Sequence, residues 1–158
     1  MTQKKFLPSS PHGTQAWLTT VRAYNLCASV VATRLAEIGL RVADLEVLAT
    51  LATTPGITQQ ELAARCFVTK SGISMLLTHM EQENLVTRLA DDGDARLKRL
   101  ALTEEGEKLA AKAMQVQAEV VSAMVAGSSD EEIEMVGKMM EQVASRLEAL
   151  QQSLKKRR

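Results

Sequence analysis

The side chains best suited to chemistry lie on one face of a helix that we predict after Thr69. The apolar residues have helical spacing and predict an inner face of Ile73, Leu76, Leu77 and Met80. The opposite face carries Lys70, Ser71, Ser74, Met75, Thr78 and His79. Its hydroxyl, ammonium and imidazole groups can bond phosphates or base edges, and the sequence has no carboxylate between Arg65 and Glu81 to repel a phosphate. This face indicates a helix that enters the major groove of DNA.

A shorter helix precedes this one. Thr58 and Glu61 form a T-x-x-E capping box, which marks where the shorter helix begins. Its inner face is formed by Leu62, Ala63 and Cys66. Thr69 can cap the second helix, whose N-terminus can receive a phosphate. Two helices joined by a tight connection predict a helix-turn-helix.

Two short β runs follow the second helix. Asn84 is a plausible left-handed cap, after which residues 85–90 and 97–102 read as strands. Residues 91–94, Asp-Asp-Gly-Asp, are typical of a turn. The pattern predicts a hairpin, and a hairpin after a helix-turn-helix is a wing.

The wing carries the remaining candidate DNA contacts. Arg96, near the tip, is the side chain that we expect in the minor groove, where the negative potential favours Arg. Asp94 would project from the same side of an extended strand and hold the guanidinium in place. Arg88 and Lys98 are further candidates. The simpler alternative for Arg96 is a surface ion pair with Asp94.

Two helices are expected before this region. The first begins at Thr14 and has a heptad seam of Trp17, Val21, Tyr24, Ala28, Val31, Leu35 and Ile38. Gly39 ends it. The second spans residues 44–53, is stopped by Pro55-Gly56, and has an inner face of Leu45, Leu48, Leu51 and Ala52.

Two long helices are expected after the wing. Thr103 caps the first, and Gly127-Ser128 ends it. Ser129 and Glu132 form a second capping box. The last helix has an unbroken a/d series of Ile133, Val136, Met140, Val143, Leu147, Leu150 and Leu154.

The predicted organisation is mostly α-helical and dimeric. One winged helix cannot cover apolar seams at both ends of the chain, so we expect residues 14–40 and 104–154 to pack across a two-fold axis. Residues 44–103 form the winged helix-turn-helix, residues 1–13 a flexible arm and residues 155–158 a basic tail. Two-fold symmetry places two recognition helices roughly 34 Å apart and predicts a pseudo-palindromic operator.

Composition sets limits on this interpretation. The chain has 158 residues, 19 basic and 19 acidic, so its formal net charge is zero and non-specific DNA affinity should be modest and salt-sensitive. The sequence has neither a stretch apolar enough to span a membrane nor an N-terminal secretory signal. The two cysteines do not form a C-x-x-C pair, which favours a reducing cytoplasm. No pair of residues has the spacing of zinc ligands, so we expect neither a metal nor another cofactor.

An ordered series of segments resembles the MarR (multiple antibiotic resistance regulator) family of winged-helix repressors: GITQQELA, TKSGIS, NLVTR, D-A-R and LALTEEG. The resemblance implies a homodimeric, ligand-responsive transcriptional regulator, usually a repressor, with double-stranded DNA as partner. Asn84 stands where the family usually has Gly, and Asn also tolerates positive φ. Ala95 stands where the family often has a second Arg, which weakens the expected grip of the wing.

The resemblance also implies an effector crevice between the dimer helices and the winged helix, suited to a small anionic or phenolic ligand. Carried over to this chain, it would be lined by Trp17, Arg22, Tyr24, Arg41 and Glu46. Some family members sense peroxide through a Cys in the first helix, so Cys27 is a possible redox residue. The simpler alternative is that Cys27 is a small hydrophobic residue of the core. This alternative is favoured still more strongly for Cys66.

Two other classes of function stay open. A winged-helix dimer could dock a protein instead of DNA, which zero net charge permits and Met75 on the outer face supports. An enzyme is the least favoured, because the sequence contains no G-x-S-x-G, H-E-x-x-H or Gly-rich phosphate loop.

Overall fold

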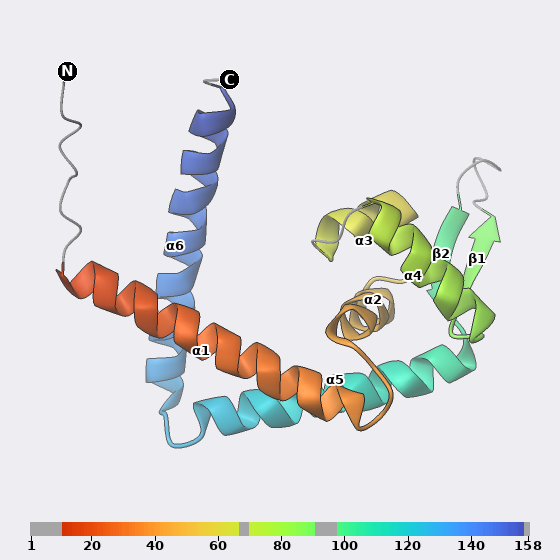
Figure 1. Ribbon diagram of the computed structural model, residues 1–158, viewed down its shortest axis with the longest axis horizontal. Coiled ribbons are helices and arrows are strands. Elements are labelled where there is room, and N and C mark those ends of the chain that lie inside the picture. Colours follow the sequence, from red (N-terminus) through yellow and green to blue (C-terminus); the bar gives the residue numbers. More distant parts are fainter. Residues whose placement is uncertain (1–10, 67–69, 91–97, 157–158) are drawn as a thin grey trace. The chain divides into compact units, whose positions relative to one another are not determined.

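The computed structural model describes residues 11–66, 70–90 and 98–156 (Figure 1). The elements follow one another as α1 (Pro11–Ala36), α2 (Val42–Thr53), α3 (Gln59–Arg65), α4 (Lys70–Gln82), β1 (Val86–Ala90), β2 (Lys98–Leu102), α5 (Glu104–Val125) and α6 (Asp130–Lys155). The chain forms two compact units, Met1–Val120 and Val121–Arg158. The predicted fold class, mostly helical with a winged helix, is confirmed.

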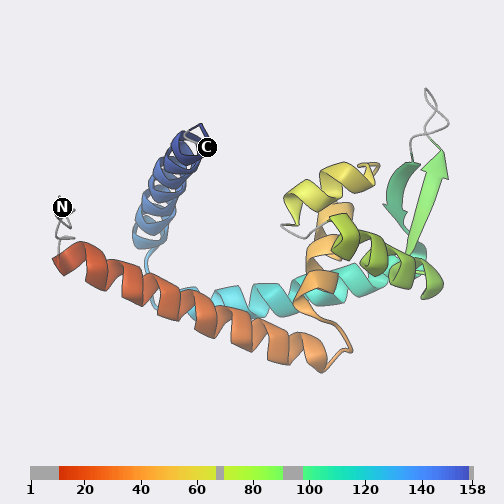
Figure 2. The ribbon, with the colours of Figure 1, turned by 45° about the horizontal axis from the view of Figure 1, so that its top comes forward.

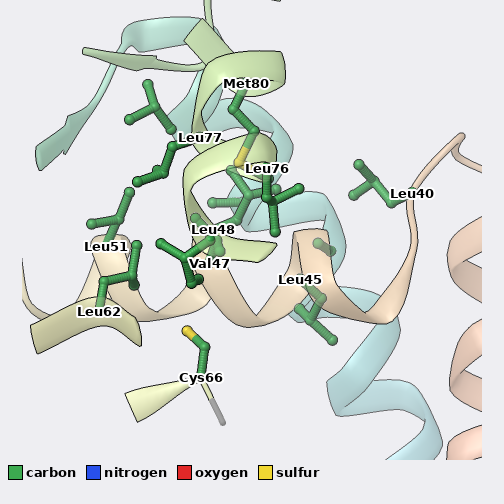
Figure 3. Packing of buried hydrophobic residues seen from close by; sticks show 14 of the residues in the cluster. Leu40, Leu45, Val47, Leu48, Leu51, Leu62, Cys66, Leu76, Leu77 and Met80 are labelled. Atoms are coloured by element: carbon green, nitrogen blue, oxygen red, sulfur yellow. The ribbon is translucent and has the colours of Figure 1, made fainter. Parts of the chain in front are cut away.

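The core of the first unit lies among α2, α3 and α4. Leu48, Leu62 and Leu77 have no exposed surface, and their side chains project into the space between these helices (Figure 3). The inner face predicted for α4 is confirmed because Ile73, Leu76, Leu77 and Met80 are all buried. Burying each large aliphatic side chain stabilises the fold by about 2 kcal/mol.

Local signals placed several helix boundaries correctly. The capping box before α3 is present: the Glu61 N–H donates to Thr58 Oγ1 at 3.3 Å, and the Thr58 N–H donates to Glu61 Oε2 at 2.7 Å. The Thr103 hydroxyl accepts the Gly106 N–H at 3.0 Å and caps α5. Asn84 has the predicted positive φ, at 54°. The expected cap at Thr69 lies outside the described residues.

Two helices begin earlier than predicted. Helix α1 begins at Pro11 and not at Thr14, because proline suits a first helical turn, where an N–H would have no partner. Helix α2 begins at Val42 and not at Asp44. The Asp44 carboxylate sits in the first turn and accepts the Arg41 N–H at 2.7 Å, so it caps the helix from within.

One inner-face prediction was wrong. Ala52 is exposed, whereas Leu45, Leu48 and Leu51 are buried as expected. The buried residues of α2 also include Val47, which the predicted stripe omitted. Helix α2 is enclosed on more of its circumference than a one-sided stripe allows, because it packs against several elements of the winged helix.

The wing is an antiparallel hairpin with Val86 opposite Leu102 and Ala90 opposite Lys98 (Figure 2). The first strand begins one residue later than predicted, at Val86 and not at Leu85, whereas Leu97, the predicted first residue of the second strand, lies outside the described residues. A further pairing was not predicted: Leu100 exchanges backbone hydrogen bonds with Gly56 and Ile57, at 3.0 and 2.9 Å. Thr58 also forms a β-bridge with Arg99. The hairpin is therefore fastened to the segment that leads into α3.

The second unit consists mainly of α6. Its predicted capping box is present, since the Glu132 N–H donates to Ser129 Oγ and the Ser129 N–H donates to Glu132 Oε2. No residue of α6, all of which the structure describes, is buried. Its apolar a/d series is therefore exposed along the whole helix. Among the described helices, none combines the length and hydrophobicity that a membrane span requires.

Candidate nucleic-acid interface

Helix α4 presents the predicted outer face to solvent. Its described side chains Ser71, Ser74, Met75, Thr78 and His79 are all exposed. Met75 is 76% exposed. The Thr78 hydroxyl donates to the Ser74 carbonyl at 2.9 Å, and its oxygen remains an acceptor. The face offers donors and acceptors on one side of a rigid helix, which is the arrangement that base-edge contacts require.

Several predicted contacts cannot be placed on this surface. Thr69, Asp94 and Arg96 lie outside the described residues, as does the Lys70 side chain. The roles assigned to them stay predictions.

Arg88 and Lys98, the two described wing cations predicted to contact DNA, differ in their surroundings. Arg88 Nε donates to Glu81 Oε1 at 2.9 Å, and both side chains are about one third exposed. This ion pair joins β1 to the end of α4 and offsets part of the Arg88 charge. Lys98, at the start of β2, is exposed.

A groove of about 730 Å³ brings Arg88 and Lys98 together. It lies between the start of α3 and the strands, and is lined by Thr58, Gln59, Gln60, Glu61, Ala64, Arg88, Lys98 and Arg99. Arg99 was not among the residues predicted to contact DNA. Its Nη1 donates to the Gly56 carbonyl at 2.8 Å, so it fastens β2 to the α2–α3 connection. No local signal marks this contact, because Gly56 and Arg99 are distant in the sequence.

Glu61 moderates the charge of this groove. The Thr58 N–H and hydroxyl lower the pKa of Glu61, and the charges of Arg99 and Arg65 lower it further. The carboxylate is therefore ionised at neutral pH and offsets part of the positive charge. The groove suits a phosphate chain at modest affinity, in keeping with the zero net charge of the protein.

The residues proposed for the effector crevice are only partly brought together. Tyr24 and Glu46 line one cavity of about 410 Å³, along with both cysteines. Arg41 lines a different groove. Trp17 and Arg22 lie on exposed positions of α1 and line neither of these two hollows.

The two cysteines differ in exposure. Cys66 is buried and its Sγ lies 3.7 Å from the Thr50 hydroxyl, whereas Cys27 is half-buried. Burial raises the pKa of the Cys66 thiol. Cys66 therefore behaves as a core residue, as the sequence indicated. Within residues 11–66, 70–90 and 98–156, no group of three His, Cys, Asp or Glu side chains could hold a metal ion.

Comparison with known proteins identifies the family. Residues 38–97 match the sequence model of the MarR family. An HTH-type transcriptional regulator of Bacillus cereus, itself uncharacterised, is 33% identical over 105 residues, which cover 66% of this chain and 69% of that protein. The chain belongs to the MarR family. These matches confirm the family resemblance inferred from the sequence. MarR proteins are transcriptional regulators.

Solved structures agree with the MarR fold. AbsC, a MarR family regulator from Streptomyces coelicolor, superposes with a TM-score of 0.81 at 24% identity, covering 91% of this chain and 99% of that one. FabT of Streptococcus pneumoniae, solved in complex with DNA, gives a TM-score of 0.73 at 19% identity, covering 89% and 99% of the two chains. At these identities the likeness concerns the fold.

Proposed function

We propose that this MarR protein is a sequence-specific, homodimeric repressor of transcription that acts in the cytoplasm on a pseudo-palindromic operator. The proposal rests on the exposed outer face of α4, which presents Ser71, Ser74, Thr78 and His79, in a stretch whose sequence has no carboxylate between Arg65 and Glu81. This helix reads base edges in the major groove. The wing, including Lys98 and Arg96, binds the minor groove or backbone.

Dimerisation gives the exposed apolar helices a partner. The a/d residues of α6 include Val136 and Leu147, each 60% exposed, and on α1 Trp17 is 63% exposed. Such continuous apolar surface is rare on a monomer. Residues 14–40 and 104–154 form the dimerisation region, and residues 44–103 the DNA-binding region.

A small anionic or phenolic effector releases the protein from DNA. The cavity lined by Tyr24 and Glu46 has the size of a small-molecule site, about 410 Å³, and a mixed polar and apolar lining. The effector acts by favouring a dimer with wrongly spaced recognition helices. It shifts that equilibrium only by its differential affinity for the two states.

Selection of binding sites from a random duplex pool, at low and then physiological salt, tests the proposal. We expect enrichment of an inverted repeat whose half-sites are about one DNA turn apart. Ser74→Ala should weaken binding to the selected operator, while Ser153→Ala, an exposed helical serine on α6, should leave it unchanged. Unselective binding that disappears as salt rises would contradict the proposal and favour docking of a protein through Met75.

A further inference from the structure

A second groove borders α4. It lies next to the start of α2, whereas the groove described above lies next to the wing strands. It has a volume of about 670 Å³ and is lined by Gly39, Arg41, Ala43, Asp44, Gly72, Met75, Leu76 and His79. Met75 and His79 belong to the exposed outer face of α4. Arg41, at the N-terminal end of α2, therefore shares a hollow with the recognition face and not with Tyr24 and Glu46.

Arg41 is held in a fixed orientation. Its Nε and Nη2 donate to the two oxygens of Asp44, at 3.1 and 2.9 Å, and Asp44 also accepts the Arg41 backbone N–H at 2.7 Å. The Asp44 side chain is only 7% exposed, whereas the Arg41 side chain is 68% exposed. A buried carboxylate thus anchors one edge of a guanidinium whose remaining N–H donors face solvent.

We propose that Arg41 contacts the phosphate backbone of the DNA strand that borders the major groove entered by α4. This inference rests on the proposed DNA-binding function and adds a contact surface to it. An anchored guanidinium loses little side-chain entropy when it binds and can bond a phosphate through its planar edge. The charged or titratable groups that line this groove are Arg41, Asp44 and His79. Because Asp44 is already bonded to Arg41, the outward edge of the groove presents donors to an anion.

The groove suits a backbone strand better than a small effector. It opens beside the outer face of α4, so a DNA duplex that contacts Met75 and His79 passes over it. Ala43 and Leu76 provide apolar wall against which a deoxyribose can pack. A phosphate held here fixes the register of the protein on the duplex without reading the sequence.

The test is a salt titration of binding to the selected operator. Arg41→Met should weaken binding about tenfold at physiological salt, because one charge-assisted contact is lost. The slope of log affinity against log salt should fall by about 1. The loss should be equal on operators with altered bases. Arg34→Met is the matched control, since Arg34 is also exposed and paired with carboxylates, Glu37 and Glu119, but does not line the groove.

Two further variants separate this contact from misfolding. Arg41→Lys keeps the charge but lacks the planar edge, so it should keep the wild-type salt slope with part of the affinity. The double variant Arg41→Met/Asp44→Asn removes the buried negative charge that Arg41→Met leaves without a cation. It should bind DNA as weakly as Arg41→Met while melting closer to wild type.

Two outcomes overturn the inference. Wild-type affinity and slope in Arg41→Met would show that Arg41 does not contact DNA. Unchanged DNA affinity with an altered response to benzoate, used as a small aromatic carboxylate, would place Arg41 in an effector site. In both cases the wild type still selects an operator, whereas failure of the proposed function would appear as no operator selected by the wild type.

Discussion

Among single residues, Gly106 stands out because its surroundings leave no room for a side chain. A Cβ built there would lie 1.9 Å from the Leu85 carbonyl oxygen, which already accepts the Thr103 N–H at 3.1 Å. The first turn of α5 therefore touches the backbone of Leu85, which lies between α4 and β1, and no flexible side chain can move aside. We expect Gly106→Ala to lower the free energy of unfolding by at least about 2 kcal/mol, measured by urea denaturation.

Gly137 in α6 is the matched control. A Cβ at this position meets nothing within 4 Å, so Gly137→Ala should raise stability by about 0.5–1 kcal/mol through helix propensity. If both variants shifted the urea midpoint alike, the close approach of Gly106 to Leu85 would be wrong.

The Cys66 thiol gives stability a pH dependence. Burial raises its pKa in the folded protein, so the unfolded chain loses this proton first. The contribution of Cys66 is therefore fully present below the unfolded pKa of about 8.5 and is lost as pH rises through the folded pKa. Between pH 7 and pH 10, the free energy of unfolding measured by urea denaturation should fall less in Cys66→Ala than in wild type. An equal loss in the two proteins would mean that the Cys66 thiol ionises as readily in the folded protein as in the unfolded chain.

At the scale of elements, the wing depends on its connection to the segment before α3. A two-stranded hairpin is marginally stable alone. Here Leu100 pairs with Gly56 and Ile57, and Arg99 Nη1 bonds the Gly56 carbonyl at 2.8 Å. These contacts set the position of the wing relative to the helix-turn-helix. Arg99→Met should weaken operator binding about fivefold, the effect of one hydrogen bond, in a fluorescence anisotropy titration.

Arg65→Met is the control for this prediction. Arg65 also lies near Glu61 and bonds the α2–α3 connection, through Thr54 Oγ1 at 2.9 Å, but among the described residues it hydrogen-bonds neither β1 nor β2. Loss of charge alone would weaken both variants equally. A specific effect of Arg99 on the wing should also shrink when Arg96→Ala has already removed the expected minor-groove contact, because the two changes then act on one interaction.

At the scale of the whole molecule, the exposed seam of α6 predicts an obligate dimer. Leu147 is 60% exposed at an a/d position, and a carboxylate there would be buried without a partner in a dimer. We expect Leu147→Glu to raise the dimer dissociation constant at least about 100-fold, measured by sedimentation equilibrium, with a parallel loss of operator binding. Gln142→Glu, off the seam of the same helix, should remain dimeric. A monomeric wild type would contradict the two-fold arrangement.

The series of helices, the hairpin and the orientation of α4 could all be predicted from the amino-acid sequence. These depend on local rules: Thr58 and Glu61 cap a helix three residues apart, and Ile73, Leu76, Leu77 and Met80 recur with the period of the helix. The family could be inferred for the same reason, because its motifs are ordered local segments.

Which distant residues share a surface could not be predicted from the sequence and became visible in the folded structure. It separated Arg41 from Tyr24 and Glu46 and placed it beside Met75 and His79. It likewise joined Gly56 to Arg99 and brought Gly106 against Leu85. The physical reason is that such contacts depend on how elements pack across long stretches of chain, and no spacing along the sequence records that geometry.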